Sequence, residues 1–239
     1  MNNETIGISA EVGIADAFNV PVNPQYRKRA DANLVNIIKR EARSIFKKEG
    51  IPFPIEHIAE GQNPVDFLLE DNSTLSLKTN KGRLGKVAPQ VIGQPTSTTY
   101  FEFFEDKIEF ILPDSYDGKR RLFKEMSINN IDTVIEHYWD NLFECDHLLY
   151  FYEANSYSSN HQIRYVYLSK PSFRPDWKKE KFRFTQTVDS WNESCTLKYI
   201  AKNGDPISIG EFQAHRNRDC LKFRFIMEGL MYLIDSGSI

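Results

Sequence analysis

The chain has 239 residues, a formal net charge of −3 and 26% charged residues, which is typical of a globular protein. The charge excludes a protein that is basic throughout, such as a histone, but allows a local basic face. Three cysteines without a CxxC pair exclude a disulfide scaffold, and no apolar run approaches the length of a membrane helix. The polar N-terminal stretch lacks the pattern of a signal or transit peptide, so we expect a cytoplasmic protein without a membrane partner.

The first 30 residues show weak hydrophobic periodicity and a turn-like, Pro-containing stretch. We therefore expect an irregular arm there, with room for one short helix. From residue 31 onward, apolar residues recur at three- and four-residue steps. This spacing predicts a helix over 31–49, with Asp31 as its N-cap residue and Gly50 at its end.

Two short apolar segments, 65–69 and 75–78, flank the turn-forming residues 70–73 and predict a β-hairpin. A polar and basic loop follows over 79–85. The next predicted elements are, in chain order, a helix over 97–105, a strand over 107–112, and helical structure over 118–143 in which Ser127 is an N-cap.

Beyond residue 145 the sequence is rich in Tyr, Phe, Val and Ile in short runs that turn residues separate, which is typical of β-structure. The predicted strands are 147–152, 162–168, 181–187, 194–201, 208–215 and 221–227. We expect one α/β (α+β) domain over 1–239, because no stretch resembles a long linker. Its helical and catalytic part would cover 1–145, and its β-rich part would cover 146–239.

The hairpin carries the most informative residues. Asp66 opens its first strand and Lys78 closes its second, so both side chains are expected at the same edge of the sheet. A carboxylate there can hold Mg²⁺ through oxygen. A lysine beside it can orient the attacking water and face the charge of a phosphate. This pair therefore predicts metal-assisted hydrolysis of a phosphodiester.

Pro64-Val65-Asp66, followed by Ser76-Leu77-Lys78, resembles the active-site pattern of the PD-(D/E)XK nucleases, and among them of the type II restriction endonucleases. In that family an Asp at a strand start precedes an acid-X-Lys tripeptide. Ser76 stands where the acid is expected, which leaves the number and the coordination of metal ions open. The oxygen ligand would then come from elsewhere; the candidates are Gln90, Glu41 in reserve, and the weaker Glu60, Glu70 and Asp71.

The resemblance implies a mixed central sheet flanked by the helices 31–49 and 127–143. It implies that Asp66 and the backbone carbonyl of Leu77 bind Mg²⁺, that Lys78 orients the water, and that Ser76 and Gln90 complete a polar cage. It further implies 5′-phosphate products, a homodimer, and a companion DNA methyltransferase in the same system without a stable complex. Two alternatives stay open: a repair or structure-specific nuclease of the same superfamily, and a catalytically inactive DNA-binding protein of the same fold.

A basic region lies in the C-terminal half. Residues 160–224 hold thirteen Lys and Arg against seven Asp and Glu, an excess of six positive charges in a chain that is negative overall. A basic face of this size suits double-stranded DNA, which carries about one negative charge per 1.7 Å of its axis. Lys81 and Arg83, in the loop after the hairpin, are further candidates for phosphate contacts.

Within this region, residues 209–225 alternate apolar and polar side chains on both sides of a short loop, which predicts a second hairpin. Arg pairs with guanine, and Asn or Gln with adenine, in the major groove, and a β-ribbon can enter that groove. The hairpin also resembles the base-contacting C-terminal strands of some restriction endonucleases. The candidate DNA-reading residues are Gln213, His215, Arg216, Asn217 and Arg218.

Other chemistries have little support. The histidines show no zinc-ligand spacing, and the sequence contains no GxSxG elbow, P-loop or GxGxxG motif. Cys145 and His147 lie two residues apart on a predicted strand with no evident third group, which argues against a Cys–His nucleophile.

Overall fold

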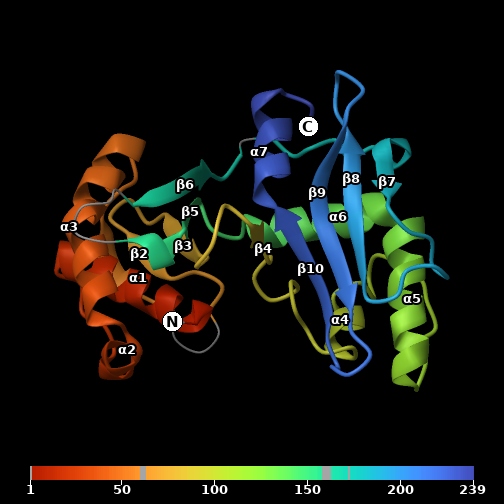
Figure 1. Cartoon of the computed structure of the whole chain (residues 1–239), viewed down its shortest axis with the longest axis horizontal. Coiled ribbons are helices and arrows are strands. Elements are labelled where there is room, and N and C mark those ends of the chain that lie inside the picture. The colour runs from red at the N-terminus through yellow and green to blue at the C-terminus, as the bar shows by residue number, and fades with distance from the viewer. Residues whose placement is uncertain (1, 60–62, 158–162, 172) are drawn as a thin grey trace. The chain divides into compact units, whose positions relative to one another are not determined.

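The computed structural model describes residues 2–59, 63–157, 163–171 and 173–239. The chain divides into two compact units, each with its own five-stranded sheet (Figure 1). The first unit contains Met1–Gly85 and Phe143–Ser172, and the second contains Lys86–Leu142 and Phe173–Ile239. The chain therefore passes from one unit to the other three times, and the fold is mixed α+β.

The sheet of the first unit has the strand order β1-β2-β3-β5-β6. β3 and β5 run parallel, whereas the other neighbours are antiparallel, so this sheet is mixed as expected. The predicted hairpin is confirmed, because Phe67 pairs with Leu75 and Leu68 with Thr74. The strands are β1 (Pro54–His57), β2 (Phe67–Leu69), β3 (Thr74–Thr79), β5 (His147–Tyr152) and β6 (Arg164–Ser169), with a 3₁₀ turn η2 at Ala154–Ser156.

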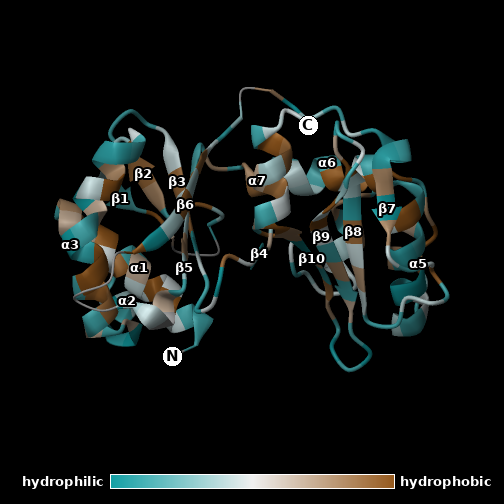
Figure 2. Ribbon diagram, turned by 45° about the horizontal axis from the view of Figure 1, so that its top comes forward, coloured by the Kyte–Doolittle hydropathy of each residue, from teal (hydrophilic) through white to brown (hydrophobic). Residues whose placement is uncertain are grey.

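The described residues of the first unit form the α-helices α1 (Asn3–Phe18), α2 (Pro24–Arg29) and α3 (Ala32–Glu49). α3 is the predicted amphipathic helix, brown on one side and teal on the other in Figure 2. The Asp31 side chain accepts a hydrogen bond from the backbone of Leu34, and Gly50 ends the helix in the left-handed conformation at φ 67°.

The prediction of an irregular N-terminal arm is wrong, because α1 is a long and largely buried helix. It lacks amphipathic periodicity since it is covered on several sides, and a helix of this kind reads as apolar all round. α1 packs closely on α3: a Cβ atom on Gly13 would lie 2.9 Å from Cβ of Ile38. Residues of both helices share one hydrophobic core with Phe67, Leu75 and other residues of the sheet.

The sheet of the second unit is antiparallel throughout, in the order β4-β10-β9-β8-β7. The strands are β4 (Lys86–Val87), β7 (Phe182–Phe184), β8 (Ser194–Ile200), β9 (Pro206–Ala214) and β10 (Leu221–Ile226). The helices are α4 (Thr99–Glu102), α5 (Tyr116–Asn129), α6 (Ile131–Leu142) and α7 (Met227–Asp235), with a 3₁₀ turn η3 at Lys179–Lys181.

The prediction of one central sheet between the helices 31–49 and 127–143 is therefore wrong. α6, which forms most of the second of these helices, packs on the sheet of the second unit, where Tyr138 stacks on Phe223 at 4.2 Å between ring centroids. The expected inner boundary after residue 145 also differs from the structure, because β5 and β6 complete the first sheet. A single domain over 1–239 stays a prediction.

Three local predictions in the second unit also differ. Residues 107–112 form no strand, and Ser127 lies buried inside α5, whereas Ser115 caps α5 by accepting a hydrogen bond from Gly118 N. The predicted helix over 118–143 is divided at Asn130, the C-cap residue of α5. β1 and α7 were not predicted, because both are short and lie beside segments with other strong signals.

Two glycines of α1 provide a matched test of the packing between α1 and α3. We expect Gly13→Ala to lower the free energy of unfolding by about 1–3 kcal/mol, because its Cβ meets Ile38 and Val35 O at 2.9–3.0 Å. Gly7→Ala places its Cβ 3.5 Å from Thr79 Oγ1, an ordinary contact, so helix propensity should stabilise the protein by up to about 1 kcal/mol. Urea denaturation measures both, and equal effects would contradict the close approach of the helices.

Candidate active site

The structure brings Asp66 together with the Ser76–Lys78 end of the hairpin. Asp66 lies directly before β2, and its backbone N–H donates to Leu75 O at 2.9 Å. Its carboxylate accepts hydrogen bonds from the backbone N–H of Leu77 at 2.5 Å and from the hydroxyl of Ser76 at 3.3 Å. Both donors contact the same oxygen, Oδ2, so neither of them uses Oδ1.

Burial dominates the electrostatics of this site. It raises the pKa of the Asp66 carboxyl to about 6, with a further increase from the negative charge of Glu11, while Lys78 and the Leu77 N–H act in the opposite direction. Burial also lowers the pKa of the Lys78 amine, although the charge of Asp66 partly counteracts this effect. Both groups are therefore closer to neutrality than their exposed counterparts, as is common at functional sites.

Glu11 of α1 is a member of this site that the sequence analysis missed. Its charge is felt by both Asp66 and Lys78. Its Oε2 lies 2.8 Å from Nε2 of His57, whose side chain is only 1% exposed and whose ring packs edge-on against Phe67. The signal in the sequence was Glu11 as the one carboxylate in the mostly apolar stretch 5–15. The weak periodicity of that stretch concealed it.

The other candidates for the missing acid lie elsewhere. Glu41 of α3 accepts a hydrogen bond from the backbone of Ile163 at 3.1 Å. Glu70 and Asp71 are exposed in the turn between β2 and β3, and Glu60 lies outside the described residues. Gln90 belongs to the second unit, in the segment after β4, and its role stays a prediction.

The donor atoms around Asp66 fit a hard cation. The carboxylates here are those of Asp66 and Glu11, and the Leu77 carbonyl stays a predicted ligand. Mg²⁺ is commonly held by one or two carboxylates with substrate and water oxygens. In residues 2–59, 63–157, 163–171 and 173–239, no group of three His, Cys, Asp or Glu side chains is arranged to hold a metal ion. A protein site made of thiolate and imidazole ligands therefore has no support in this part of the chain.

A cysteine nucleophile is also unsupported by the structure. Burial raises the pKa of the Cys145 thiol to about 11, so the thiol stays protonated at neutral pH. His147 directs Nδ1 to the hydroxyl of Tyr167 at 2.8 Å. The positive charge of Lys78 lies near Cys145 and partly opposes the effect of burial, but it leaves the thiol pKa high.

The loop after β3 presents its basic residues to solvent. Lys81 and Arg83 are both exposed. The loop backbone is fixed by hydrogen bonds from Asn80 Nδ2 to Arg83 O at 3.0 Å and from Glu153 N to Gly82 O at 2.5 Å. These two side chains therefore extend from a defined loop that follows Lys78 directly in the sequence.

The second predicted hairpin is confirmed as β9 and β10, which pair in register from Ala214–Leu221 to Gly210–Phe225. Most apolar side chains of both strands are buried, and polar ones alternate with them as predicted. Arg216, Asn217 and Arg218 are exposed in the connecting loop.

Two of the proposed DNA-reading residues have protein partners. The His215 ring lies 3.3 Å from Glu193, and Gln213 donates to Glu211 at 2.8 Å. Glu211 also pairs with Lys86 and Arg224. The loop residues are therefore more accessible for contacts with DNA bases than His215 and Gln213 are.

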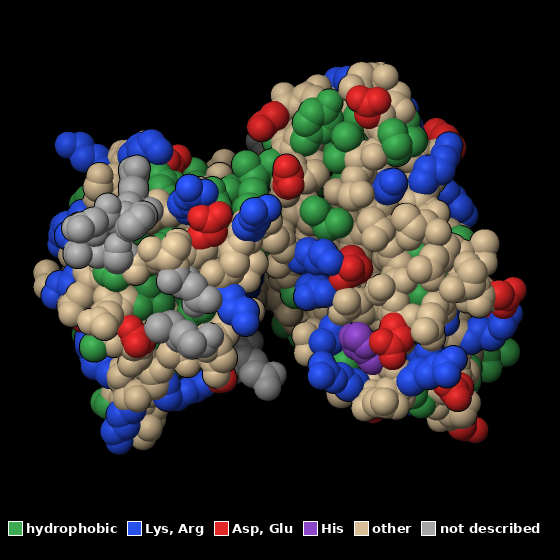
Figure 3. Space-filling view, in the orientation of Figure 1, with side chains coloured by type: hydrophobic (Ala, Val, Ile, Leu, Met, Phe, Trp, Pro, Cys, Tyr) green, Lys and Arg blue, Asp and Glu red, His purple; other side chains and the backbone are tan. Residues whose placement is uncertain are grey.

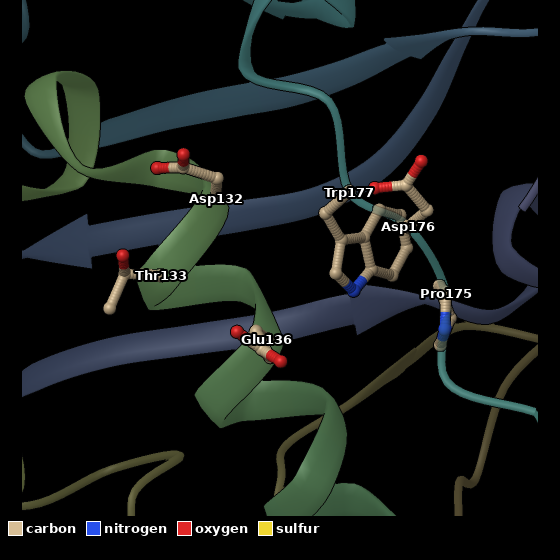
Figure 4. Close-up of a pocket in the computed structure, with 6 residues that line it drawn as sticks. All are labelled: Asp132, Thr133, Glu136, Pro175, Asp176 and Trp177. Atoms are coloured by element: carbon tan, nitrogen blue, oxygen red, sulfur yellow. The ribbon is translucent and has the colours of Figure 1, made fainter.

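A pocket of about 210 Å³ between α6 and the segment before η3 is a poor candidate for binding nucleic acid (Figure 4). Its lining includes the carboxylates of Asp132, Glu136 and Asp176, beside Trp177. Negative side chains at these positions would repel a phosphate backbone.

None of the helices in the described part of the chain combines the length and apolar character that crossing a membrane requires.

Comparison with known proteins gives one relevant match. Over 182 residues, 76% of this chain, the sequence is 35% identical to a protein of Paramecium bursaria Chlorella virus 1 that bears the name Type II restriction enzyme CviAII. The aligned region covers 47% of that protein, so the chain spans about half of its relative's length. No family model and no solved structure matches the chain.

The raised pKa of Asp66 predicts how stability depends on pH in metal-free protein. Between about pH 4 and 6 the folded state binds more protons at Asp66 than the unfolded state, so this residue's contribution to stability is lost as the pH rises. We therefore expect Asp66→Asn to raise the free energy of unfolding by roughly 1–3 kcal/mol relative to the original chain between pH 4 and 7. Urea denaturation in EDTA measures the difference, and a difference that does not change with pH would contradict the assignment.

Proposed function

We propose that this protein is a type II restriction endonuclease, which hydrolyses phosphodiester bonds of double-stranded DNA at a short specific sequence with Mg²⁺. The observation that carries the proposal is the buried Asp66 carboxylate, which accepts hydrogen bonds from Ser76 and the Leu77 N–H on the strand that also carries Lys78. The 35% identity to a protein named a type II restriction enzyme supports the same class of reaction. A homodimer, a cytoplasmic location and a companion methyltransferase belong to this proposal.

Each group of the site has a distinct role in the proposed reaction. Asp66 and the Leu77 carbonyl would hold Mg²⁺, which when bound polarises the phosphate and its water. Lys78 orients the attacking water and lies close to the negative charge that grows on the phosphate. Water adds to phosphorus, the bond to the 3′ oxygen breaks, and the strand is left with a 5′ phosphate. Ser76 holds the Asp66 carboxylate through its hydroxyl.

Glu11 is our candidate for the carboxylate that Ser76 cannot supply. Its contact with buried His57 keeps one oxygen engaged, and Glu11 acts electrostatically on both Asp66 and Lys78. Glu41 is a poorer candidate because its carboxylate accepts the Ile163 N–H and pairs with Arg40. The role of Gln90 stays a prediction.

The proposed DNA-reading element is the β9–β10 hairpin. Its exposed loop offers Arg216, Asn217 and Arg218, side chains that can pair with base edges in the major groove. His215 and Gln213 would also contact bases, after giving up their present contacts with Glu193 and Glu211. Lys81 and Arg83 would contact phosphates near the scissile bond.

Cleavage of unmethylated phage DNA, with Mg²⁺ or with EDTA, tests the proposal. We expect discrete fragments only with Mg²⁺, and we expect Asp66→Ala and Lys78→Ala each to slow cleavage by roughly 10²–10⁴-fold. Asp71→Asn is the matched control, since it changes an exposed acid in the turn of the same hairpin, and it should cut at the original rate.

Each result decides between the alternatives. A smear of products would favour a nuclease without sequence choice, such as a repair enzyme. Salt-sensitive DNA binding without cleavage would favour an inactive DNA-binding protein. Unchanged cleavage by either the Asp66 or the Lys78 variant would show that the active site lies elsewhere.

The role of Glu11 has its own test, in which Glu11→Gln and Glu41→Gln are compared over a series of Mg²⁺ concentrations. We expect Glu11→Gln to raise the Mg²⁺ concentration for half-maximal cleavage by about 10–100-fold, because a group that supports the metal is lost. Glu41→Gln should match the original chain. The reverse result would assign the missing carboxylate to Glu41.

A further inference from the structure

A basic pocket of about 170 Å³ lies on α5, outside every group given a role above. It has room for one tetrahedral oxyanion with water. Its lining combines three cationic side chains with two carboxylates and one valine: Arg120, Arg121, Lys124, Asp117, Asp189 and Val188. The formal charge of the lining is therefore positive.

The central cation is held in place. The Arg120 side chain is only 8% exposed, and it donates to Asp117 at 2.9 Å and to the backbone carbonyl of Asn192 at 3.3 Å. Its partner Asp117 is 88% exposed. Asp189, which lies 3.3 Å from Arg121, is 83% exposed, and Arg121 also pairs with Glu125 at 2.8 Å. The acids that pair with these arginines are therefore at least partly solvated. A buried and oriented guanidinium beside solvated acids is a favourable anchor for an oxyanion.

The positive charges of this pocket repel one another. The pKa of the Lys124 amine is lowered, first by burial and then by the charges of Arg120, Arg216 and Arg121, while the charge of Asp117 acts in the opposite direction. Lys124 also donates to the carbonyl of Trp191 at 2.5 Å, which fixes its position near the other cations. A bound anion would relieve this repulsion.

The helix that carries the pocket is hydrogen-bonded to the tip of the β9–β10 hairpin. The hydroxyl of Tyr116, the first residue of α5, lies 2.5 Å from the backbone carbonyls of both His215 and Arg218. Arg216 of the same loop is close enough to act on Lys124. Figure 3 shows Lys and Arg side chains, with Asp, Glu and His side chains among them, at this end of the second unit, where β9 and β10 turn and α5 lies.

We propose that the α5 pocket binds a backbone phosphate of the DNA duplex whose bases the β9–β10 loop reads. Phosphate contacts set the position of a reading element on the duplex, and base contacts supply the sequence preference. The link through Tyr116 joins the anchor to the loop, so a phosphate held at Arg121 and Lys124 sets where Arg216 and Arg218 meet the groove. This inference rests on the proposed function, because it assumes that the protein binds DNA.

Fluorescence anisotropy with a short labelled DNA duplex in EDTA, over a series of NaCl concentrations, tests the inference without cleavage. Arg121→Gln and Lys124→Gln should each weaken binding by about 3–10-fold and reduce the slope of log K against log salt by about 0.9. Lys124→Arg should restore both values. Lys119→Gln is the matched control, because it removes the same charge from the same helix at a residue that contacts Thr98 instead.

The outcomes separate this inference from the proposed function. If the original chain binds no DNA, both fail. If it binds DNA and the Arg121 and Lys124 variants match Lys119→Gln in slope, the pocket is no phosphate anchor, while the proposed function stands. Calorimetric titration with inorganic phosphate adds a second arm: binding that Lys124→Gln abolishes, with an unchanged DNA slope, would identify a site for free phosphate and overturn the inference. Melting temperatures equal to that of the original chain confirm that the variants are folded.

Discussion

The candidate site depends on one constraint: the buried carboxylate of Asp66, just before β2, is held by hydrogen bonds from the neighbouring strand β3. Leaving water raises the free energy of the charged Asp66 side chain, and the Leu77 N–H and Ser76 hydroxyl compensate only in part. The part of this free energy that is not compensated raises the pKa of the Asp66 carboxyl. The site is thus less stable in its charged form than an exposed carboxylate would be, and a divalent cation would supply the missing compensation.

The parallel pairing of β3 with β5 fixes this edge. Asp146, just before β5, accepts hydrogen bonds from both N and Oγ1 of Thr74, each at 2.9 Å, across a sequence separation of 72 residues. The pairing sets Lys78 opposite Tyr150 and leaves Leu75 and Leu77 in the core with α1 and α3. Apolar packing on one face therefore holds Ser76 and Lys78 in their places on β3.

Local patterns predicted the parts of the fold whose causes are local. Asp31 and Gly50 mark the ends of α3, and alternation marks the β9–β10 hairpin, because capping and one-sided burial are written in neighbouring residues. α1 escaped prediction because burial on several sides removes its periodicity. Its omission also hid Glu11, so the pair Asp66 and Lys78 was predictable while the carboxylate near them was not. The assignment of the 127–143 helix to the first sheet failed because sequence order does not reveal which of two sheets a helix covers.

The three crossings between the units have a consequence for how the chain acquires its structure. Neither unit is a continuous segment, so no simple truncation isolates one of them. During synthesis the hairpin with Asp66 and Lys78 leaves the ribosome long before its parallel neighbour β5, and the intervening residues belong to the other unit. Such non-local pairing is slow to form. The nascent protein thus has no completed candidate site until β5 has been synthesised, so the activity proposed above would be absent from unfinished chains.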